Sequence, residues 1–191
     1  MGKKVDCVIH LAAKTDSRES QQIPGDYYRT NVLGTINILE FCRKNNVKLI
    51  FASTGQVCGT PKYLGVDEKH PTNPENTYTK SKLLAENLCK NYSKDFGVNS
   101  IILRFFNVYG QYQKENFFIP KVLYASLRGK TLKLNNPNIK RDFVYIDDVI
   151  SSIKSAVDYT KSNFEIFNIA TGKPVSVKQI INLAQKITNK K

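Results

Sequence analysis

Three short apolar runs constrain the fold of this chain more than any other feature of its sequence. They cover residues 5–11, 47–53 and 99–106, and each is continuously apolar rather than alternating. Continuous runs of this length are typical of strands that are covered on both faces, as in parallel sheets. Segments with helical periodicity separate the runs, so the sequence predicts an α/β fold built on a doubly wound parallel sheet.

Helices are expected at residues 26–45 and 77–96, where apolar residues recur on one stripe. Asn76 or Thr77 is a suitable N-cap for the second helix, and Gly97 is a suitable terminator. Beyond residue 110 the elements are shorter and more scattered. Helices are expected there at residues 117–128, 147–159 and 175–187, and strands at residues 131–134, 143–145 and 164–169.

The chain is strongly basic. Of its 191 residues, 29 are Lys or Arg and 16 are Asp or Glu, which gives a net charge of +13. Such a balance favours anionic partners such as nucleic acid, an anionic membrane or a phosphorylated small molecule, although a solvated lysine surface gives the same number. The basic residues are dispersed and no nucleic-acid-reading motif accompanies them, so nucleic acid is not the expected partner. No run of 18 apolar residues is present, so no membrane span is expected.

Cysteine and histidine are too scattered to indicate a metal site. The four cysteines include no CxxC pair, and only two histidines accompany them. We therefore expect no metal. Free thiols are typical of a reducing compartment, and we expect a cytoplasmic location.

The first candidate for chemistry is the pair Tyr78 and Lys82. The two residues are four apart on a predicted helix and so share one of its faces. A nearby ammonium favours the phenolate form of a tyrosine, which makes that tyrosine a usable base. An exposed pair without function has the same spacing. The context strengthens the functional interpretation, because Ser53 and Thr54 end a predicted strand, where parallel sheets bind ligands.

Two further candidates follow in the second half of the chain. Asn107 follows the predicted strand at residues 99–106, and Arg141 stands beside the aromatic residues Phe143 and Tyr145. An arginine in such a position can hold a phosphate, and a surface Arg–Asp pair with Asp142 is the alternative.

Together these motifs resemble the extended short-chain dehydrogenase/reductases, and within them the nucleotide-sugar epimerase/dehydratase group. The matching segments occur in that group's order and span nearly the whole chain. They are residues 6–13, 30–42, 50–59, 77–86, 102–110, 141–149 and 167–177.

The resemblance implies a partial Rossmann-like domain at residues 1–110. It also implies part of a small substrate-binding lobe at residues 111–191, with segments that return to the main domain. It makes Tyr78 the catalytic base and Lys82 its partner, which also holds the nicotinamide ribose of NAD. The other implied catalytic residues are Thr54 and Asn31. The other implied cofactor contacts are Leu11, Ala12, Ala13, Ser53 and Val108. The implied substrate contacts are Thr54, Asn107, Asn116 and Arg141.

The residues after Thr54 distinguish between branches of this group. Dehydratases carry an acidic pair there, whereas this chain has Gly55 and Gln56. We therefore favour a branch resembling UDP-glucose 4-epimerase, with a UDP-linked sugar as the expected substrate. A dehydratase or reductase of the same group is the alternative. Cys58 stands where the group usually has tyrosine.

The glycine-rich turn that opens this fold and holds the cofactor pyrophosphate is absent from the sequence. The chain thus matches the interior of a two-lobed enzyme, truncated at both ends. We expect it to bind NAD weakly or not at all by itself, and NAD rather than NADP. A non-catalytic remnant that acts as an interaction protein is a further alternative. The resemblance also implies a homodimer formed through the helices near residues 26–45 and 77–96.

Overall fold

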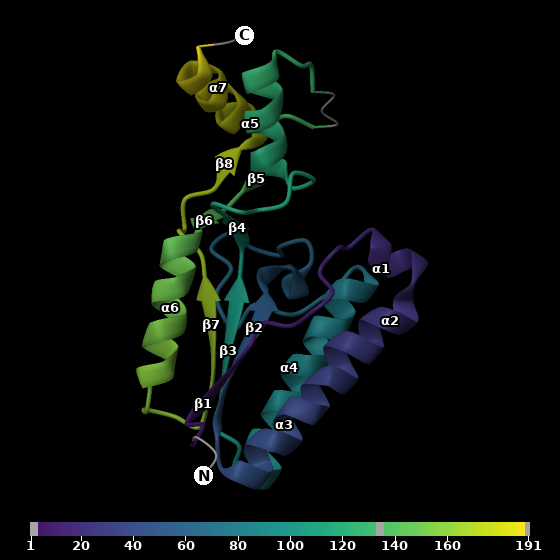
Figure 1. The fold of residues 1–191 in the computed structure, drawn as a ribbon, viewed down its shortest axis with the longest axis vertical. Coiled ribbons are helices and arrows are strands. Elements are labelled where there is room, and N and C mark those ends of the chain that lie inside the picture. Colours follow the sequence, from purple (N-terminus) through teal and green to yellow (C-terminus); the bar gives the residue numbers. More distant parts are fainter. Residues whose placement is uncertain (1–3, 133–135, 190–191) are drawn as a thin grey trace. The chain divides into compact units, whose positions relative to one another are not determined.

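The computed structural model describes residues 4–132 and 136–189 and divides the chain into two compact units (Figure 1). The first unit comprises Met1–Phe106 and Ile150–Ile169. The second comprises Asn107–Val149 and Ala170–Lys191. Each unit is described by itself below.

A four-stranded parallel sheet forms the first unit. Its strands are β1 (Cys7–His10), β2 (Lys48–Thr54), β3 (Ser100–Phe105) and β7 (Phe164–Ile169), hydrogen-bonded in the order β1-β2-β3-β7. All three pairings are parallel. The predicted parallel α/β sheet is therefore confirmed.

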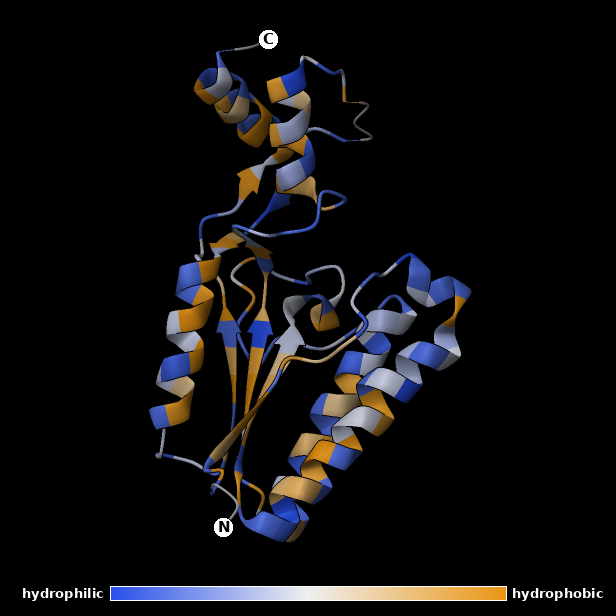
Figure 2. Cartoon of the chain, viewed as in Figure 1, coloured by the Kyte–Doolittle hydropathy of each residue, from blue (hydrophilic) through white to orange (hydrophobic). Residues whose placement is uncertain are grey.

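Helices cover both faces of this sheet. Helices α3 (Gly34–Asn45) and α4 (Thr77–Phe96) lie on one side, and α6 (Ile146–Asp158) lies on the other (Figure 1). Figure 2 shows β3 and β7 as hydrophobic along most of their length and hydrophilic at their carboxyl ends. Residues that alternate along β2 enter two different cores: Phe51 packs in the cluster with Leu39 and Ala85, and Ile50 packs in the cluster with Ala156. Burial on both faces explains why the sequence of β2 is continuously apolar.

Helix α4 begins and ends where the sequence predicts. The Asn76 side chain accepts a hydrogen bond from the Thr79 backbone N–H, and the Thr79 hydroxyl accepts one from the Asn76 backbone N–H. Gly97 ends the helix with a φ of 70°, a left-handed conformation that glycine adopts without a steric penalty. This reciprocal cap fixes the start of the helix that carries Tyr78 and Lys82.

The helical segment before β2 differs from the single helix expected at residues 26–45. It consists of α2 (Pro24–Tyr28), a π-helical turn (Arg29–Leu33) and α3, and the short helix α1 (Glu19–Gln22) precedes it. The π turn is centred on Asn31, whose side chain is buried. Single π turns widen a helix locally and are frequent at functional sites.

The second unit contains two small sheets and two helices. Strands β4 (Asn107–Tyr109) and β6 (Phe143–Tyr145) pair in parallel, and β5 (Lys140–Arg141) and β8 (Val175–Ser176) pair antiparallel. Helices α5 (Phe118–Arg128) and α7 (Val177–Thr188) complete the unit. Sequence analysis missed β4, β5 and β8, because two or three residues are too few to show a period.

Two predicted features need separate mention. The strand expected at residues 131–134 is irregular at residues 131 and 132, and its other two residues lie outside the described part of the chain. Within that described part, no helix combines the length and apolar character that a membrane span requires.

Candidate active site

The structure brings Thr54 and Tyr78 together at the carboxyl end of the sheet. Thr54 is the last residue of β2, and Tyr78 lies in the first turn of α4. Burial raises the pKa of the Tyr78 phenol, and the hydrogen bond from the Thr54 side chain opposes that rise. The Thr54 hydroxyl also accepts a hydrogen bond from the Gln56 backbone N–H at 3.2 Å.

Lys82 lies one helical turn after Tyr78, and only 3% of its surface is exposed. Its Nζ atom lies 4.1 Å from the centre of the Phe51 ring, within the range of a cation–π interaction. Burial lowers the pKa of Lys82 to about 8, although the nearby Cys89 and Glu86 partly oppose that shift. Burial and the charge of Lys82 together lower the pKa of His10 on β1. A buried ammonium of this kind suits contact with a polar, electron-rich ligand.

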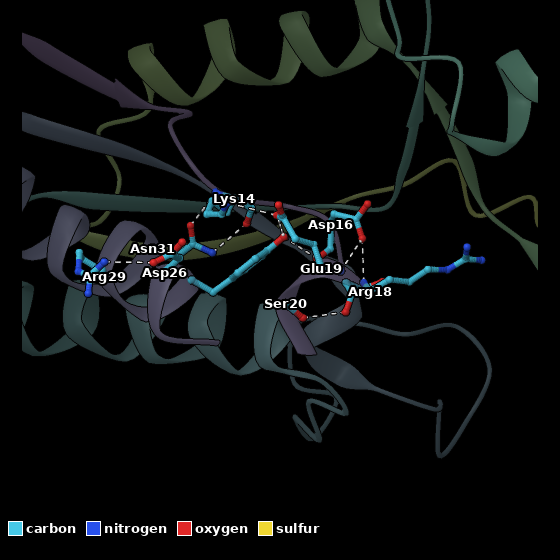
Figure 3. Close-up of polar contacts among 10 residues, drawn as sticks. Lys14, Asp16, Arg18, Glu19, Ser20, Asp26, Arg29 and Asn31 are labelled. Atoms are coloured by element: carbon cyan, nitrogen blue, oxygen red, sulfur yellow. Dashed lines mark hydrogen bonds and ion pairs between the residues drawn. The ribbon is translucent and has the colours of Figure 1, made fainter. Parts of the chain in front are cut away.

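Asn31 acts on the backbone rather than on the phenol. Its side-chain amide donates to the Lys14 carbonyl and accepts from the Lys14 N–H, both at 2.9 Å (Figure 3). It also donates to the Ser81 hydroxyl at 2.9 Å, and that hydroxyl donates to the Tyr78 carbonyl at 2.7 Å. Asn31 thereby ties the segment after β1 to the first turns of α4. Ser81 was missed in the sequence, where only its place between Tyr78 and Lys82 distinguishes it.

The segment predicted to pass the dinucleotide follows directly after β1. Leu11 and Ala12 are exposed and Ala13 is half-buried. The residues that follow are anchored, since the Tyr27 hydroxyl shares its hydrogen between the Asp16 carbonyl and the Glu19 carboxylate. Leu11 and Ala12 are therefore the exposed residues of a segment whose continuation is anchored. Ser53, the other cofactor residue predicted from β2, is buried and donates its hydroxyl hydrogen to Glu86.

The remaining predicted residues belong to the second unit. Val108 lies on β4 opposite Val144, and the Asn107 side chain donates to the Asp142 carbonyl at 2.8 Å. Arg141 is exposed on β5, and Asn116 is exposed before α5.

Asp142, next to Arg141, was considered in the sequence only as the partner of that arginine in a surface pair. Its carboxylate accepts hydrogen bonds from the Thr171 backbone and hydroxyl and from the Gly172 N–H, at 2.7–2.9 Å. These bonds hold the strand that carries Arg141 against the turn at residues 171–172. The signal available in the sequence was an acidic residue beside the arginine and a later Thr-Gly turn.

Within residues 4–132 and 136–189, no group of three or more His, Cys, Asp and Glu residues is arranged to hold a metal ion. The four cysteines are free thiols. Burial raises the pKa of the Cys58 thiol.

A parallel sheet with Thr54 at its carboxyl end, beside Tyr78 and the buried Lys82 of helix α4, agrees with the resemblance to the short-chain dehydrogenase/reductase class of α/β proteins. Comparison with known families makes this more specific. The family described as "NAD dependent epimerase/dehydratase family" matches residues 1–170. The chain belongs to that family.

Similar proteins have names that agree with this assignment. A Methanocaldococcus jannaschii protein, provisionally named a UDP-glucose 4-epimerase, is 40% identical over 190 residues, which are 95% of this chain and 60% of the relative. The chain thus spans about three-fifths of that relative's length.

Two similar solved structures each contain a nicotinamide cofactor. UDP-glucuronic acid 4-epimerase of Bacillus cereus, in complex with NAD and UDP-4-deoxy-4-fluoro-glucuronic acid, is 34% identical with a TM-score of 0.90. The match covers 97% of this chain and 60% of that one. RMD from Pseudomonas aeruginosa, complexed with NADPH, is 27% identical with a TM-score of 0.91 over 99% of this chain and 68% of its own.

Proposed function

We propose that this chain carries the proton-transfer site of a nucleotide-sugar epimerase that uses NAD. The observation that carries the proposal is the placement of Thr54, at the carboxyl end of β2, beside Tyr78 in the first turn of α4, one helical turn from the buried Lys82. A base and a hydroxyl that lie side by side at the carboxyl end of a sheet can both reach one hydroxyl of a sugar. The names of the similar proteins support the same reaction class.

The residues of the first unit are suited to holding the nicotinamide end of NAD. Lys82 presents a buried cation beside an aromatic face, and its ammonium can donate hydrogen bonds to a ribose. Leu11 and Ala12 are exposed and Ala13 is half-buried, so a flat ring system can approach this segment. When bound, NAD supplies reversible acceptance of a hydride from a carbon of the sugar.

The side chains handle the proton and the orientation of the substrate. Thr54 hydrogen-bonds the sugar hydroxyl and aligns it with Tyr78. Tyr78 takes the proton from that hydroxyl and returns it when the alcohol is formed again. The protonated Lys82 favours the phenolate that this exchange requires. Between the two proton transfers the substrate is a keto sugar, whose rotation in the site exposes its opposite face and allows the inverted alcohol to form.

The position after Thr54 supports an epimerase over a dehydratase. A Cβ atom on Gly55 would lie 2.6 Å from the ring of Phe106, so an acidic side chain there would displace that ring. Gln56 is exposed and does not exchange protons at neutral pH. Water elimination needs an acid and a base besides Tyr78, and these two positions do not supply them.

We assign the sugar-nucleotide contacts to Asn107, Asn116 and Arg141 in the lobe at residues 111–191 and its border. Arg141 is exposed and its strand is anchored through Asp142, which leaves the guanidinium available for a diphosphate. A UDP-linked sugar is the proposed substrate, because the similar epimerases carry UDP-sugars in their names. Replacement of Arg141 with Met should weaken UDP binding about tenfold, whereas Lys121→Met on α5 should leave it unchanged.

We propose NAD rather than NADP as the cofactor, with weak binding by this chain alone. The family description and the NAD-bound epimerase support NAD, although one similar structure carries NADPH. No glycine-rich turn follows β1, β2 or β3 in the sequence, so backbone donors for the pyrophosphate are missing after those strands. Calorimetric titration should therefore give a Kd well above micromolar for NAD, and micromolar binding would contradict this.

The test of the proposed function is conversion of UDP-glucose to UDP-galactose by the purified chain with excess NAD. We expect the parent chain to carry out this conversion. Tyr78→Phe should lower its rate about 10²–10⁴-fold, because that change removes only the base. Tyr112→Phe is the matched control, since Tyr112 is fully exposed. Bound NAD and UDP-glucose without conversion would contradict the proposal and favour the non-catalytic remnant.

We further propose a homodimer and a cytoplasmic location. Leu33, Phe41 and Leu84 are 42–55% exposed on the segments before β2 and on α4, and a partner copy would cover them. Free cysteines agree with a reducing compartment. Sedimentation should show a dimer that Leu84→Glu dissociates, and a monomeric parent chain would contradict the proposal.

A further inference from the structure

A buried ion pair links helix α4 to the sheet behind the candidate active site. The Arg104 side chain on β3 donates to both carboxylate oxygens of Glu86, with the shortest contact, from Nη2 to Oε2, at 2.7 Å. The Ser53 hydroxyl on β2 donates to the same carboxylate. The side chains of Arg104 and Glu86 are 4% and 3% exposed. One carboxylate therefore joins three elements by directed hydrogen bonds.

The cluster formed by Ser53, Glu86 and Arg104 stands directly beside the reactive residues in the sequence. Ser53 immediately precedes Thr54, and Arg104 lies opposite Ser53 in the register of β2 and β3. Glu86 lies one helical turn after Lys82 and two turns after Tyr78 on α4. Any shift of α4 along the sheet at this level changes the separation between the Thr54 hydroxyl and the Tyr78 phenol.

Stability alone does not account for this cluster. Burying two charges costs free energy, which their attraction returns only when the hydrogen bonding is complete. Here the bonding is incomplete, because Arg104 Nη1 is buried without a hydrogen-bond partner in the described part of the chain. Three apolar side chains would fill the same space without that cost. What a set of apolar side chains lacks is direction, since four hydrogen bonds to one carboxylate allow one position of the helix. The charge of Glu86 also helps to keep Lys82 protonated against the effect of burial.

We propose that Glu86 is a positioning residue, which holds helix α4 in register with β2 and so fixes the position of the Tyr78 phenol relative to the Thr54 hydroxyl. Its importance for epimerisation rests on the proposed function. The effect of Glu86 on the Tyr78 phenol does not rest on the proposed function, because that effect exists without cofactor or substrate. The two proposals can therefore fail separately.

The test measures ionisation of the phenol at position 78 by fluorine NMR. Tyr78 is replaced with 3,5-difluorotyrosine, whose fluorines lower the phenol pKa into a range where the protein stays folded. The bond from Thr54 favours the phenolate, so Thr54→Ala should decrease the acid dissociation constant about threefold to tenfold. Glu86→Met with Arg104→Met removes the cluster without a change of net charge. It should decrease the constant about threefold, and it should have no further effect when combined with Thr54→Ala.

An unchanged dissociation constant in the folded double variant would overturn the proposal. The proposal would also be overturned if the double substitution decreased the dissociation constant equally in the Thr54→Ala background. The cluster would then act on the phenol by a route that does not involve Thr54. Asp26→Asn with Arg29→Met is the control, since that exposed pair lies within 24–33 and joins no strand to α4. If the double variant does not fold, Ser53→Ala takes its place, because it removes one hydroxyl. A decrease in that variant supports the proposal, and no change contradicts it.

Discussion

The two units of the chain hold their candidate functional residues in different ways. In the first unit, Tyr78 and Lys82 lie on a twenty-residue helix that packs on a parallel sheet, and buried side chains such as Asn31 hydrogen-bond around them. In the second unit, Arg141 lies exposed on a two-residue strand whose neighbour Asp142 binds a turn. The first arrangement holds its side chains in fixed positions, as the proposed proton transfer requires, and the second leaves a long side chain exposed, as the proposed contact with an anion requires.

The largest expected difference between the units is in their apolar cores. Leu103→Ala removes a fully buried side chain from the cluster on the α6 side of the sheet and should cost about 3 kcal/mol in the free energy of unfolding. Leu183→Ala on α7 removes a side chain that is 53% exposed and should cost about 0.5 kcal/mol. Urea unfolding of both variants measures this. Equal losses would show that the second unit is packed as tightly as the first.

A smaller effect is expected at the buried polar contacts. Asn31→Ala leaves the Lys14 backbone and the Ser81 hydroxyl without their partner, which should cost about 2 kcal/mol. Asn37→Ala on α3 is the matched control, because Asn37 is exposed. The amide of Lys14 should also lose protection from hydrogen exchange. If that amide stays protected in Asn31→Ala, the side chain does not anchor the loop after β1.

The smallest effect, when taken over a single pH unit, concerns the titration of Lys82. The pKa of Lys82 is about 8 in the folded chain and about 10.5 when unfolded, so between these values the unfolded state binds more protons. Stability contributed by Lys82 should therefore rise with pH across this window, by at most about 1.4 kcal/mol per pH unit. Other groups titrate there too, so the measured quantity is the difference between the parent chain and Lys82→Met. A difference that falls from pH 8 to pH 10 would mean that the Lys82 pKa is raised.

The first unit was largely predictable from the sequence, and physical reasons explain where prediction failed. The strands were visible because burial on both faces makes their sequences continuously apolar, and α4 was visible because Asn76 and Gly97 mark its ends. The π turn was not visible, because Asn31 departs from helical geometry for contacts with Lys14 and Ser81 that lie far away in sequence.

The candidate site likewise contains residues that could be predicted from the sequence and residues that could not. Tyr78 and Lys82 were found by their spacing on one helix. Glu86 and Arg104 were not, because residues of separate elements meet only once the sheet is formed. Asp142 was considered only as an alternative partner of Arg141, and its bonds to the turn at residues 171–172 have no local sequence pattern.

The central claim is that Tyr78 and its neighbours serve reversible oxidation and reduction at one carbon of a UDP-sugar. The most direct test is incubation of the chain and NAD with UDP-glucose that carries deuterium at the epimerised carbon. An epimerase returns the same hydride to the other face of the keto sugar, so UDP-galactose that retains the deuterium is expected. Product without deuterium, or a dehydrated or reduced sugar in its place, would contradict the claim.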